Sequence, residues 1–291
     1  LLAWNLLNVG VLFYAFWKIP FANKNYKYLA FVFILIELIT STQNSQCNAL
    51  IAGLIILAYL ALEKNKIAIS ALLIVSTVFI KLFGIVALAL FLFYPNKIKS
   101  GVYVILWTVI LGALPLIVIP YDQLIFLYKS WLSLLQNDHS ALMKFSVMGI
   151  LQSWFGVSAN YKTLVLLIGA ITFCVPLIRF KLYNQFRYKT LFLASILIWV
   201  IIFNHMAESA TFIIAIAGVA IWFFTKKTPS KLDYVLLIST FVLTSLTPTD
   251  IFPASLRNNF FIPYTIKVLP CILVWIKINY ELLTLKVTPN H

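Results

Sequence analysis

Apolar stretches recur along the whole chain, separated by short turns that carry most of its basic residues. Hydrophobic residues make up 63% of the 291 residues and charged residues 10%, whereas a soluble domain is nearer half apolar and a quarter charged. Most stretches are longer than the roughly 10-residue strands of an outer-membrane barrel. They predict an all-α, polytopic helical membrane protein with about eleven spans, in a single transmembrane domain over residues 1–291. The stretches lie at 1–17, 28–40, 49–62, 67–80, 82–95, 101–120, 162–178, 190–203, 211–225, 232–246 and 267–283.

The basic residues predict how these helices are oriented. Lysine and arginine are enriched in the cytoplasmic loops of membrane proteins. If the loop at 18–27 is cytoplasmic, 16 of the 22 basic residues fall on that side and 6 on the other. We expect a bacterial inner (cytoplasmic) membrane protein, and the charge distribution places its working surface on the outer face. Because the net charge of +14 is spread over short loops, it indicates topology and no nucleic-acid-binding face.

The long outer segment 121–161 is predicted to lie along the membrane surface. Its apolar residues recur at helical spacing and polar residues interrupt them, which is typical of an amphipathic helix in the interface plane. The apolar residues are Leu124, Phe126, Leu127, Trp131, Leu134 and Leu135, and the polar ones are Asp122, Lys129, Asn137, Asp138 and His139.

An uncharged polar run at 41–48, with the sequence Ser-Thr-Gln-Asn-Ser-Gln-Cys-Asn, separates two apolar stretches. The charge distribution places it on the outer side, together with the loop 204–210. Amide and hydroxyl groups at the mouth of a helix pair are suited to hold a sugar or a phosphate. The run is therefore the first candidate for a binding site.

Charged groups in or beside apolar spans are costly, so each indicates function unless it is paired or hydrated. Glu37 lies within the second span and either supports the site or pairs with a lysine of another helix. Lys81 lies between stretches 67–80 and 82–95, which form either two half-helices or one interrupted helix. Its ammonium either binds a phosphate held at the membrane surface or extends to the outer lipid headgroups. His205 and Glu208 are three residues apart, so on a helix both would face one cavity. Two such ligands are too few for a metal site, and we expect neither metal nor cofactor.

Several of these residues resemble glycosyltransferase family 87. A Gln–x–Asn element in residues 43–50 precedes an apolar helix, and Lys81 follows the next one. Residues 203–208, Phe-Asn-His-Met-Ala-Glu, run into the apolar stretch 211–215 and are similar to a bacterial branch of the same family.

The resemblance implies a GT-C-type membrane enzyme. It would transfer a hexose, typically mannose, from a polyprenyl-phosphate donor to a lipid or glycan acceptor on the outer face, inverting the anomeric centre. Gln43, Asn44 and Asn48 would then line the donor pocket, and Lys81 would neutralise the donor phosphate. His205 and Glu208 would bind the acceptor or position the donor.

The resemblance also implies a catalytic carboxylate in the first outer loop of the family. The chain begins within an apolar stretch and without an initiator methionine. We therefore expect that loop, with further spans, upstream of Leu1. The catalytic residue is then unknown in this sequence, and the fragment alone would be inactive.

Three other functions are compatible with a helical membrane chain. A transporter or flippase of lipid-linked sugars would need polar groups through the bilayer midplane and paired repeats, whereas the polar groups here gather on one side. A surface-polysaccharide polymerase would carry arginine-rich outer loops, and Arg257 is the single arginine assigned to the outer side. The third alternative is a non-catalytic membrane scaffold.

Overall fold

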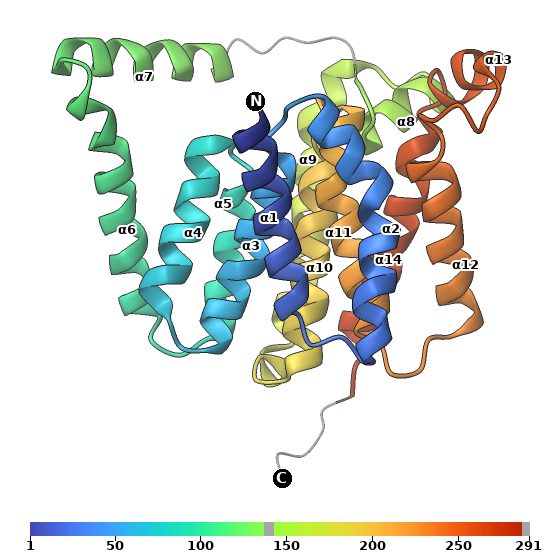
Figure 1. The fold of residues 1–291 in the computed structure, drawn as a ribbon, viewed down its shortest axis with the longest axis horizontal. Coiled ribbons are helices and arrows are strands. Elements are labelled where there is room, and N and C mark those ends of the chain that lie inside the picture. The colour runs from blue at the N-terminus through green and yellow to red at the C-terminus, as the bar shows by residue number, and fades with distance from the viewer. Residues whose placement is uncertain (137–142, 287–291) are drawn as a thin grey trace.

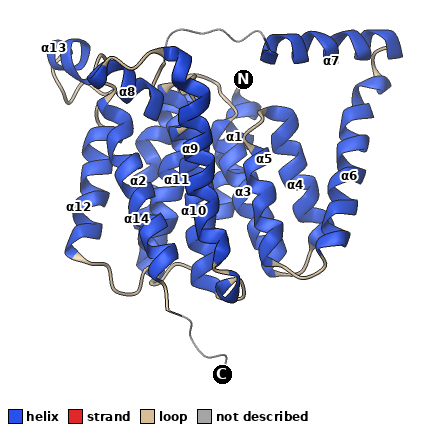
Figure 2. Ribbon diagram, turned by 180° about the vertical axis from the view of Figure 1, so that it is seen from behind, coloured by secondary structure: helices blue, strands red, loops and turns tan. Residues whose placement is uncertain are grey.

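The computed structural model of the chain describes residues 1–136 and 143–286, and all regular elements in these ranges are helical (Figures 1 and 2). The α-helices are α1 (Leu2–Lys18), α2 (Lys24–Gln43), α3 (Asn48–Glu63), α4 (Ile67–Ile80), α5 (Gly84–Ala87), α6 (Lys97–Ala113), α7 (Tyr121–Gln136), α8 (Val147–Phe155), α9 (Lys162–Cys174), α10 (Phe186–Ile202), α11 (Phe212–Phe224), α12 (Lys231–Thr240), α13 (Ala254–Leu256) and α14 (Leu269–Thr284). Short helical segments extend or connect them: η1 (Leu88–Phe93), η2 (Leu114–Ile117), η3 (Ala159–Tyr161), η4 (Val175–Ile178), η5 (Phe180–Leu182), η6 (Ser209–Thr211), η7 (Phe241–Ser245), η8 (Arg257–Phe261) and η9 (Ile266–Val268). The prediction of an all-α protein is confirmed over the described residues.

Each of the eleven apolar stretches coincides with a helix, but their number as membrane spans is not confirmed. Among the described residues, two helices are long and apolar enough to cross a membrane, Lys97–Ile117 and Ala159–Ile178. A third span results if Ala254–Phe261 and Ile266–Thr284, bent by 81°, count as one. The other apolar helices are shorter. At 1.5 Å per residue, the 16 residues of α3 give a helix of about 24 Å, less than the ~30 Å hydrocarbon core.

The centre of the bundle is α11, in which every residue from Phe212 to Phe224 is buried. A helix that is apolar all round is stable only when it is enclosed, and α10, α2, α3 and α14 pack around it. In contrast, α6 has one buried residue, Ser100, and exposes Val102, Ile105 and Val109. Such an apolar outer surface is suited to lipid.

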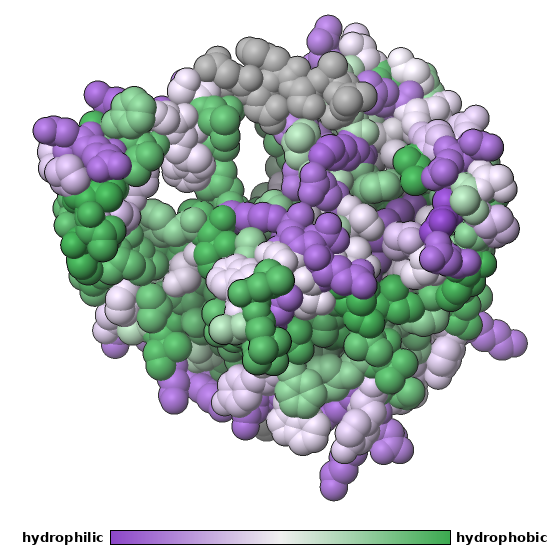
Figure 3. All heavy atoms as spheres, turned by 45° about the horizontal axis from the view of Figure 1, so that its top comes forward, coloured by the Kyte–Doolittle hydropathy of each residue, from purple (hydrophilic) through white to green (hydrophobic). Residues whose placement is uncertain are grey.

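The two ends of the bundle differ in charge. The turns that carry the 16 basic residues of one side lie together at the end where the chain terminates, here called the lower end (Figure 1). The upper end holds the run 41–48, Lys81 and the loop 204–210. Figure 3 shows polar side chains gathered across this upper face, above a belt of apolar side chains. The bundle therefore has the two-sided arrangement that the charge pattern predicted.

Helix α7 lies across the upper end, roughly perpendicular to the bundle axis (Figure 1). Its apolar side chains Phe126, Leu127 and Leu134 are exposed. The predicted helix is therefore confirmed over 121–136, and its position along a membrane surface stays a prediction. Asn137, Asp138 and His139 lie outside the described residues, and the rest of the segment, from 143 to 161, contains α8 and η3.

Candidate functional site

Five polar side chains from four separate segments meet at the upper end of the bundle. We call Gln46, Asn48, Lys81, Lys144 and Glu208 the Lys81 cluster. The Lys81 ammonium donates to Asn48 Oδ1 at 2.9 Å and to Gln46 Oε1 at 3.4 Å. The Asn48 amide donates to Gln46 Oε1 at 2.6 Å and to the Ala210 carbonyl at 2.9 Å. Gln46 Nε2 donates to Glu208 Oε2 at 3.2 Å, and Lys144 Nζ lies 2.8 Å from Glu208 Oε1.

The Lys81 cluster carries more positive than negative charge. Lys81 and Lys144 contribute two positive charges, and Glu208 contributes one negative charge. Lys144 pairs with Glu208. Lys81 donates to neutral amide oxygens and lies over the Phe83 ring, and among the described residues no carboxylate lies within ion-pair distance of it. The net charge of +1 leaves Lys81 available to an anionic ligand.

Polar side chains of α1 fix the polar run that supplies Gln46 and Asn48. The Trp4 indole donates to the Ser45 carbonyl at 3.0 Å, and the Asn5 amide donates to the Thr42 carbonyl at 3.2 Å. The fully buried Asn8 accepts a hydrogen bond from the backbone N–H of Leu50 at 3.1 Å. Since buried backbone groups must be paired, these bonds hold the α2–α3 turn against α1 and set where its amides lie.

A tight turn between α4 and α5 positions Lys81. The stretches 67–80 and 82–95 are thus separate helical elements, and Lys81 is the extended residue that ends α4, with φ −151° and ψ 142°. After Lys81 the chain reverses direction, and α5 packs against α4 with Gly84 at the closest contact between the two helices. A Cβ at Gly84 would lie 1.9 Å from Thr77 Oγ1 and 2.7 Å from the Ile74 carbonyl oxygen. Only glycine allows this return, which directs Lys81 toward Asn48.

The structure gathers some of the predicted site residues and separates others. Asn48, Lys81 and Glu208 share one network. Gln43 and Asn44 are exposed, and the Asn44 amide turns back to the Thr40 carbonyl at 2.8 Å. Gln46, which the sequence interpretation did not select, is the bridging member; its place two residues before Asn48 in the same polar run was the available signal.

The helical spacing assumed for His205 and Glu208 is wrong, because residues 204–208 form a turn and an extended stretch before η6. The two side chains therefore do not share a helix face. The His205 carbonyl instead accepts the backbone N–H of Lys144 at 2.9 Å, and the Ala207 carbonyl accepts that of Phe145 at 3.2 Å. This pairing brings Lys144 next to Glu208. The sequence could not indicate this contact, because the two residues are 64 positions apart.

Glu208 is held in its charged form. The hydrogen bond from Lys144, followed by that from Gln46, keeps the pKa of this carboxyl below its usual value of 4.5. Half of the Glu208 side chain is exposed. The carboxylate is thus an acceptor that orders Lys144 and Gln46 while remaining accessible to solvent.

Glu37 forms a buried ion pair with Lys267, 2.6 Å from Oε1 to Nζ. Their side chains are 0% and 2% exposed, and Lys267 also donates to Ser209 Oγ at 2.9 Å. Of the two interpretations of Glu37, the structure shows the pair with a lysine of another helix. That pair lies beside the site, because Ser209 directly follows Glu208.

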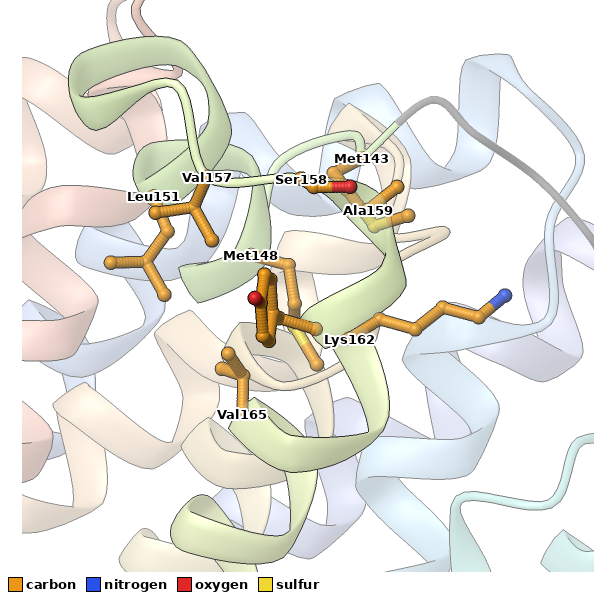
Figure 4. Close-up of a pocket in the computed structure, with 9 residues that line it drawn as sticks. Met143, Met148, Leu151, Val157, Ser158, Ala159, Lys162 and Val165 are labelled. Carbon is orange, nitrogen blue, oxygen red and sulfur yellow. The ribbon is translucent and has the colours of Figure 1, made fainter.

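Lys267 lines a second feature of the upper end, a cavity of about 340 Å³ that we call the Lys267 pocket. Its walls combine apolar, hydroxyl, amide and cationic groups, from Phe145, Ser209, Thr247, Pro248, Arg257, Asn258, Phe261, Ile262 and Lys267. A smaller hollow near α8 and α9 is lined mostly by apolar side chains such as Met148 and Val165, and Lys162 at its edge extends away from them (Figure 4). Within residues 1–136 and 143–286, no three His, Cys, Asp or Glu side chains are grouped as a metal site would require.

Comparison with known proteins adds the family. The family model described as Glycosyltransferase family 87 matches residues 1–248. Neither the curated proteins nor the solved structures contain a match to the chain. The matched region includes all five residues of the Lys81 cluster and most of the helical bundle. With more than half of its length matched, the chain belongs to glycosyltransferase family 87 and is a membrane glycosyltransferase.

Proposed function

We propose that the chain transfers a hexose, mannose by the family resemblance, from a polyprenyl-phosphate donor to a lipid or glycan acceptor. The observation that carries the proposal is the ammonium of Lys81, which pairs with no carboxylate of the described residues and is set among amides at the upper end of an apolar bundle. A lipid-linked phosphate would reach this position with its chain in the bilayer. We assign the lower end, with its basic turns, to the cytoplasm of a bacterial cell and the cluster to the outer face.

In this reaction the acceptor hydroxyl gives its proton to the catalytic carboxylate, and its oxygen attacks the anomeric carbon while the bond from that carbon to the phosphate oxygen breaks. The leaving phosphate takes the bonding electron pair, so negative charge grows on its oxygens. A fixed ammonium stabilises that charge most where water is excluded. Lys81 has this role, and Gln46 and Asn48 hold it in place.

The other candidate residues are proposed for binding rather than for bond making. Gln46 is partly exposed and has an amide group suited to sugar hydroxyls, and Glu208 orders it from the opposite side. Asn48 is fully buried and supports the donor site by holding the side chains of Lys81 and Gln46. Gln43, Asn44 and His205 belong to the same end of the bundle and are proposed as rim contacts to the donor or acceptor. The catalytic carboxylate is the one that the resemblance places in the first outer loop of the family.

Replacing Lys81 with methionine tests the proposal, because methionine keeps an unbranched side chain and removes the charge. A charge-assisted hydrogen bond contributes about 1.5–3 kcal/mol, so kcat/KM of the full-length protein with polyprenyl-phosphate mannose should fall roughly 10- to 100-fold. Lys129→Met is the matched control, since Lys129 is an exposed lysine of α7 at the same end. Equal transfer by both variants would remove Lys81 from the mechanism.

A further inference from the structure

Two short backbone segments divide the upper end into two sites. Residues 144–145 pair with the loop 204–210 through the bonds from Lys144 N to His205 O and from Phe145 N to Ala207 O. Consecutive residues of each segment contribute to different sites. Lys144 and Glu208 belong to the Lys81 cluster, whereas Phe145 and Ser209 line the Lys267 pocket. Since neighbouring Cα atoms are about 3.8 Å apart, the two sites adjoin.

The Lys267 pocket has the size and composition of a small-molecule site. Its volume of about 340 Å³ is at the lower end of the range of ligand pockets, which are mostly apolar with a few placed polar groups. Phe145, Phe261 and Ile262 form its apolar part, and Thr247 and Asn258 supply a hydroxyl and an amide.

The fold builds this pocket by bending the chain. The segment η8 (Arg257–Phe261) and the helix that follows from Ile266 are inclined by 81°, and Thr265 between them has a left-handed φ of 50°. The bend places Asn258 and Phe261 around the same cavity as Lys267.

Both cations of the pocket have a carboxylate partner. Lys267 pairs with the buried Glu37 at 2.6 Å, and Arg257 pairs at 2.8 Å with Asp250, whose side chain is 96% exposed. The charges therefore sum to zero, whereas those of the Lys81 cluster sum to +1. A neutral ligand with hydroxyl groups satisfies the polar wall without an unmatched charge, and its apolar parts fit the aromatic wall.

We propose that the Lys267 pocket binds the acceptor as a neutral sugar with an apolar tail, while the donor phosphate occupies the Lys81 cluster. This rests on the proposed function, because only a group-transfer enzyme needs two ligands side by side. The paired segments 144–145 and 204–210 would then contact both substrates, with the donor on the side of the Lys81 cluster and the acceptor on the side of the Lys267 pocket.

Direct binding tests this assignment without requiring turnover. The full chain in lipid nanodiscs is equilibrated with radiolabelled octyl α-mannoside, a neutral probe, or with octyl phosphate, an anionic one. Asn258→Ala should raise the dissociation constant for octyl α-mannoside about 2- to 10-fold, as expected for one lost hydrogen bond. Thr247→Val should act in the same direction. Asn259→Ala is the matched control, since Asn259 is the adjacent exposed amide and does not line the pocket.

Lys81→Met should leave octyl α-mannoside binding unchanged and weaken octyl phosphate binding. The inference is overturned if wild-type protein does not bind octyl α-mannoside, if Asn258→Ala and Asn259→Ala bind it equally, or if Asn258→Ala weakens octyl phosphate alone. Absence of mannose transfer by the full-length protein, when it shows the expected binding pattern, would count against the proposed function and not against the pocket.

Discussion

Lys81 and Lys267 lie at the same end of the bundle, on either side of the loop 204–210, and they differ in what opposes their charge. Lys267 is 2% exposed and meets a carboxylate at 2.6 Å. Lys81 is half-buried and meets two amide oxygens, at 2.9 and 3.4 Å. A lysine that is paired with a buried carboxylate stabilises the fold, whereas a lysine that is hydrogen-bonded only to neutral amides can still pair with an anionic ligand.

The difference has a physical origin in burial. Removing an ammonium from water costs several kcal/mol unless a counter-charge accompanies it. Lys267 lies where water is excluded and therefore requires Glu37. Lys81 retains contact with solvent, so two amides are sufficient.

The largest expected effect comes from breaking the buried pair. Glu37→Leu leaves the Lys267 ammonium buried without its counter-charge, which should lower the free energy of unfolding by about 3–5 kcal/mol. Lys81→Met, in contrast, removes bonds to neutral groups and should cost about 1 kcal/mol. Denaturant or thermal unfolding in detergent measures both. Similar losses of unfolding free energy for the two variants would show that the two lysines do not differ in how much their partners stabilise the fold.

A double variant distinguishes the cost of an unpaired charge from the cost of lost packing at the Glu37–Lys267 ion pair. Glu37→Leu with Lys267→Met replaces both charges by apolar groups, and such replacements of buried ion pairs are often neutral or stabilising. We expect the double variant to be considerably more stable than Glu37→Leu alone. A double variant as unstable as the single one would show that the cost arises from packing and not from the unpaired charge.

The second effect concerns the turn that holds Lys81. Gly84→Ala places a Cβ 1.9 Å from Thr77 Oγ1, so α5 must move away from α4. Overpacking of this kind costs about 1–3 kcal/mol, and the movement displaces Lys81 from Asn48. Transfer should therefore fall more than stability alone explains, with octyl α-mannoside binding retained.

Gly101→Ala is the control for this substitution. Nothing lies within 4 Å of a Cβ at Gly101, and alanine is favoured over glycine inside a helix by about 0.5–1 kcal/mol. The variant should be at least as stable as the wild type. If Gly84→Ala and Gly101→Ala behave alike in stability and transfer, the close approach at Gly84 does not position Lys81.

The parts of the fold that could be predicted are those set by local sequence. Each apolar stretch predicted a helix where the structure has one, and the basic turns predicted the two ends of the bundle, because both signals depend on residues close together in the sequence. Asn48, Lys81 and Glu208 were found because each is a polar residue next to an apolar helix. The number of spans could not be settled in this way, since helix length depends on where turns and breaks form.

The missed residues depend on contacts between distant segments. Gln46 bridges to Glu208 across 162 positions, and Lys144 reaches the same carboxylate across 64. The Lys267 pocket requires the bend before Ile266, and no local sequence pattern predicted that bend. For His205 and Glu208, a helical spacing was assumed where backbone pairing with residues 144–145 holds the loop extended.

The smallest effect is expected at the ion pair between Lys144 and Glu208, whose side chains are 40% and 50% exposed. Exposed pairs contribute at most about 1 kcal/mol, so Lys144→Met should scarcely change stability at neutral pH. The pKa of Glu208 is lowered chiefly by Lys144, so the pair stabilises the fold above pH 4.5 and this contribution is lost as the pH falls through the lowered pKa.

Removing Lys144 takes away the first cause of that shift and should bring the pKa of Glu208 back toward 4.5. The stability advantage of wild type over Lys144→Met should then be largest near neutral pH and shrink as the solution is acidified. Thermal unfolding followed from about pH 7 to pH 3 measures it, with the exposed Lys129→Met as the reference. Because Lys144→Met keeps the backbone bond to His205, an advantage that does not change with pH would mean that the aliphatic part of the Lys144 side chain stabilises the loop 204–210 and that its ammonium does not interact with the charge of Glu208.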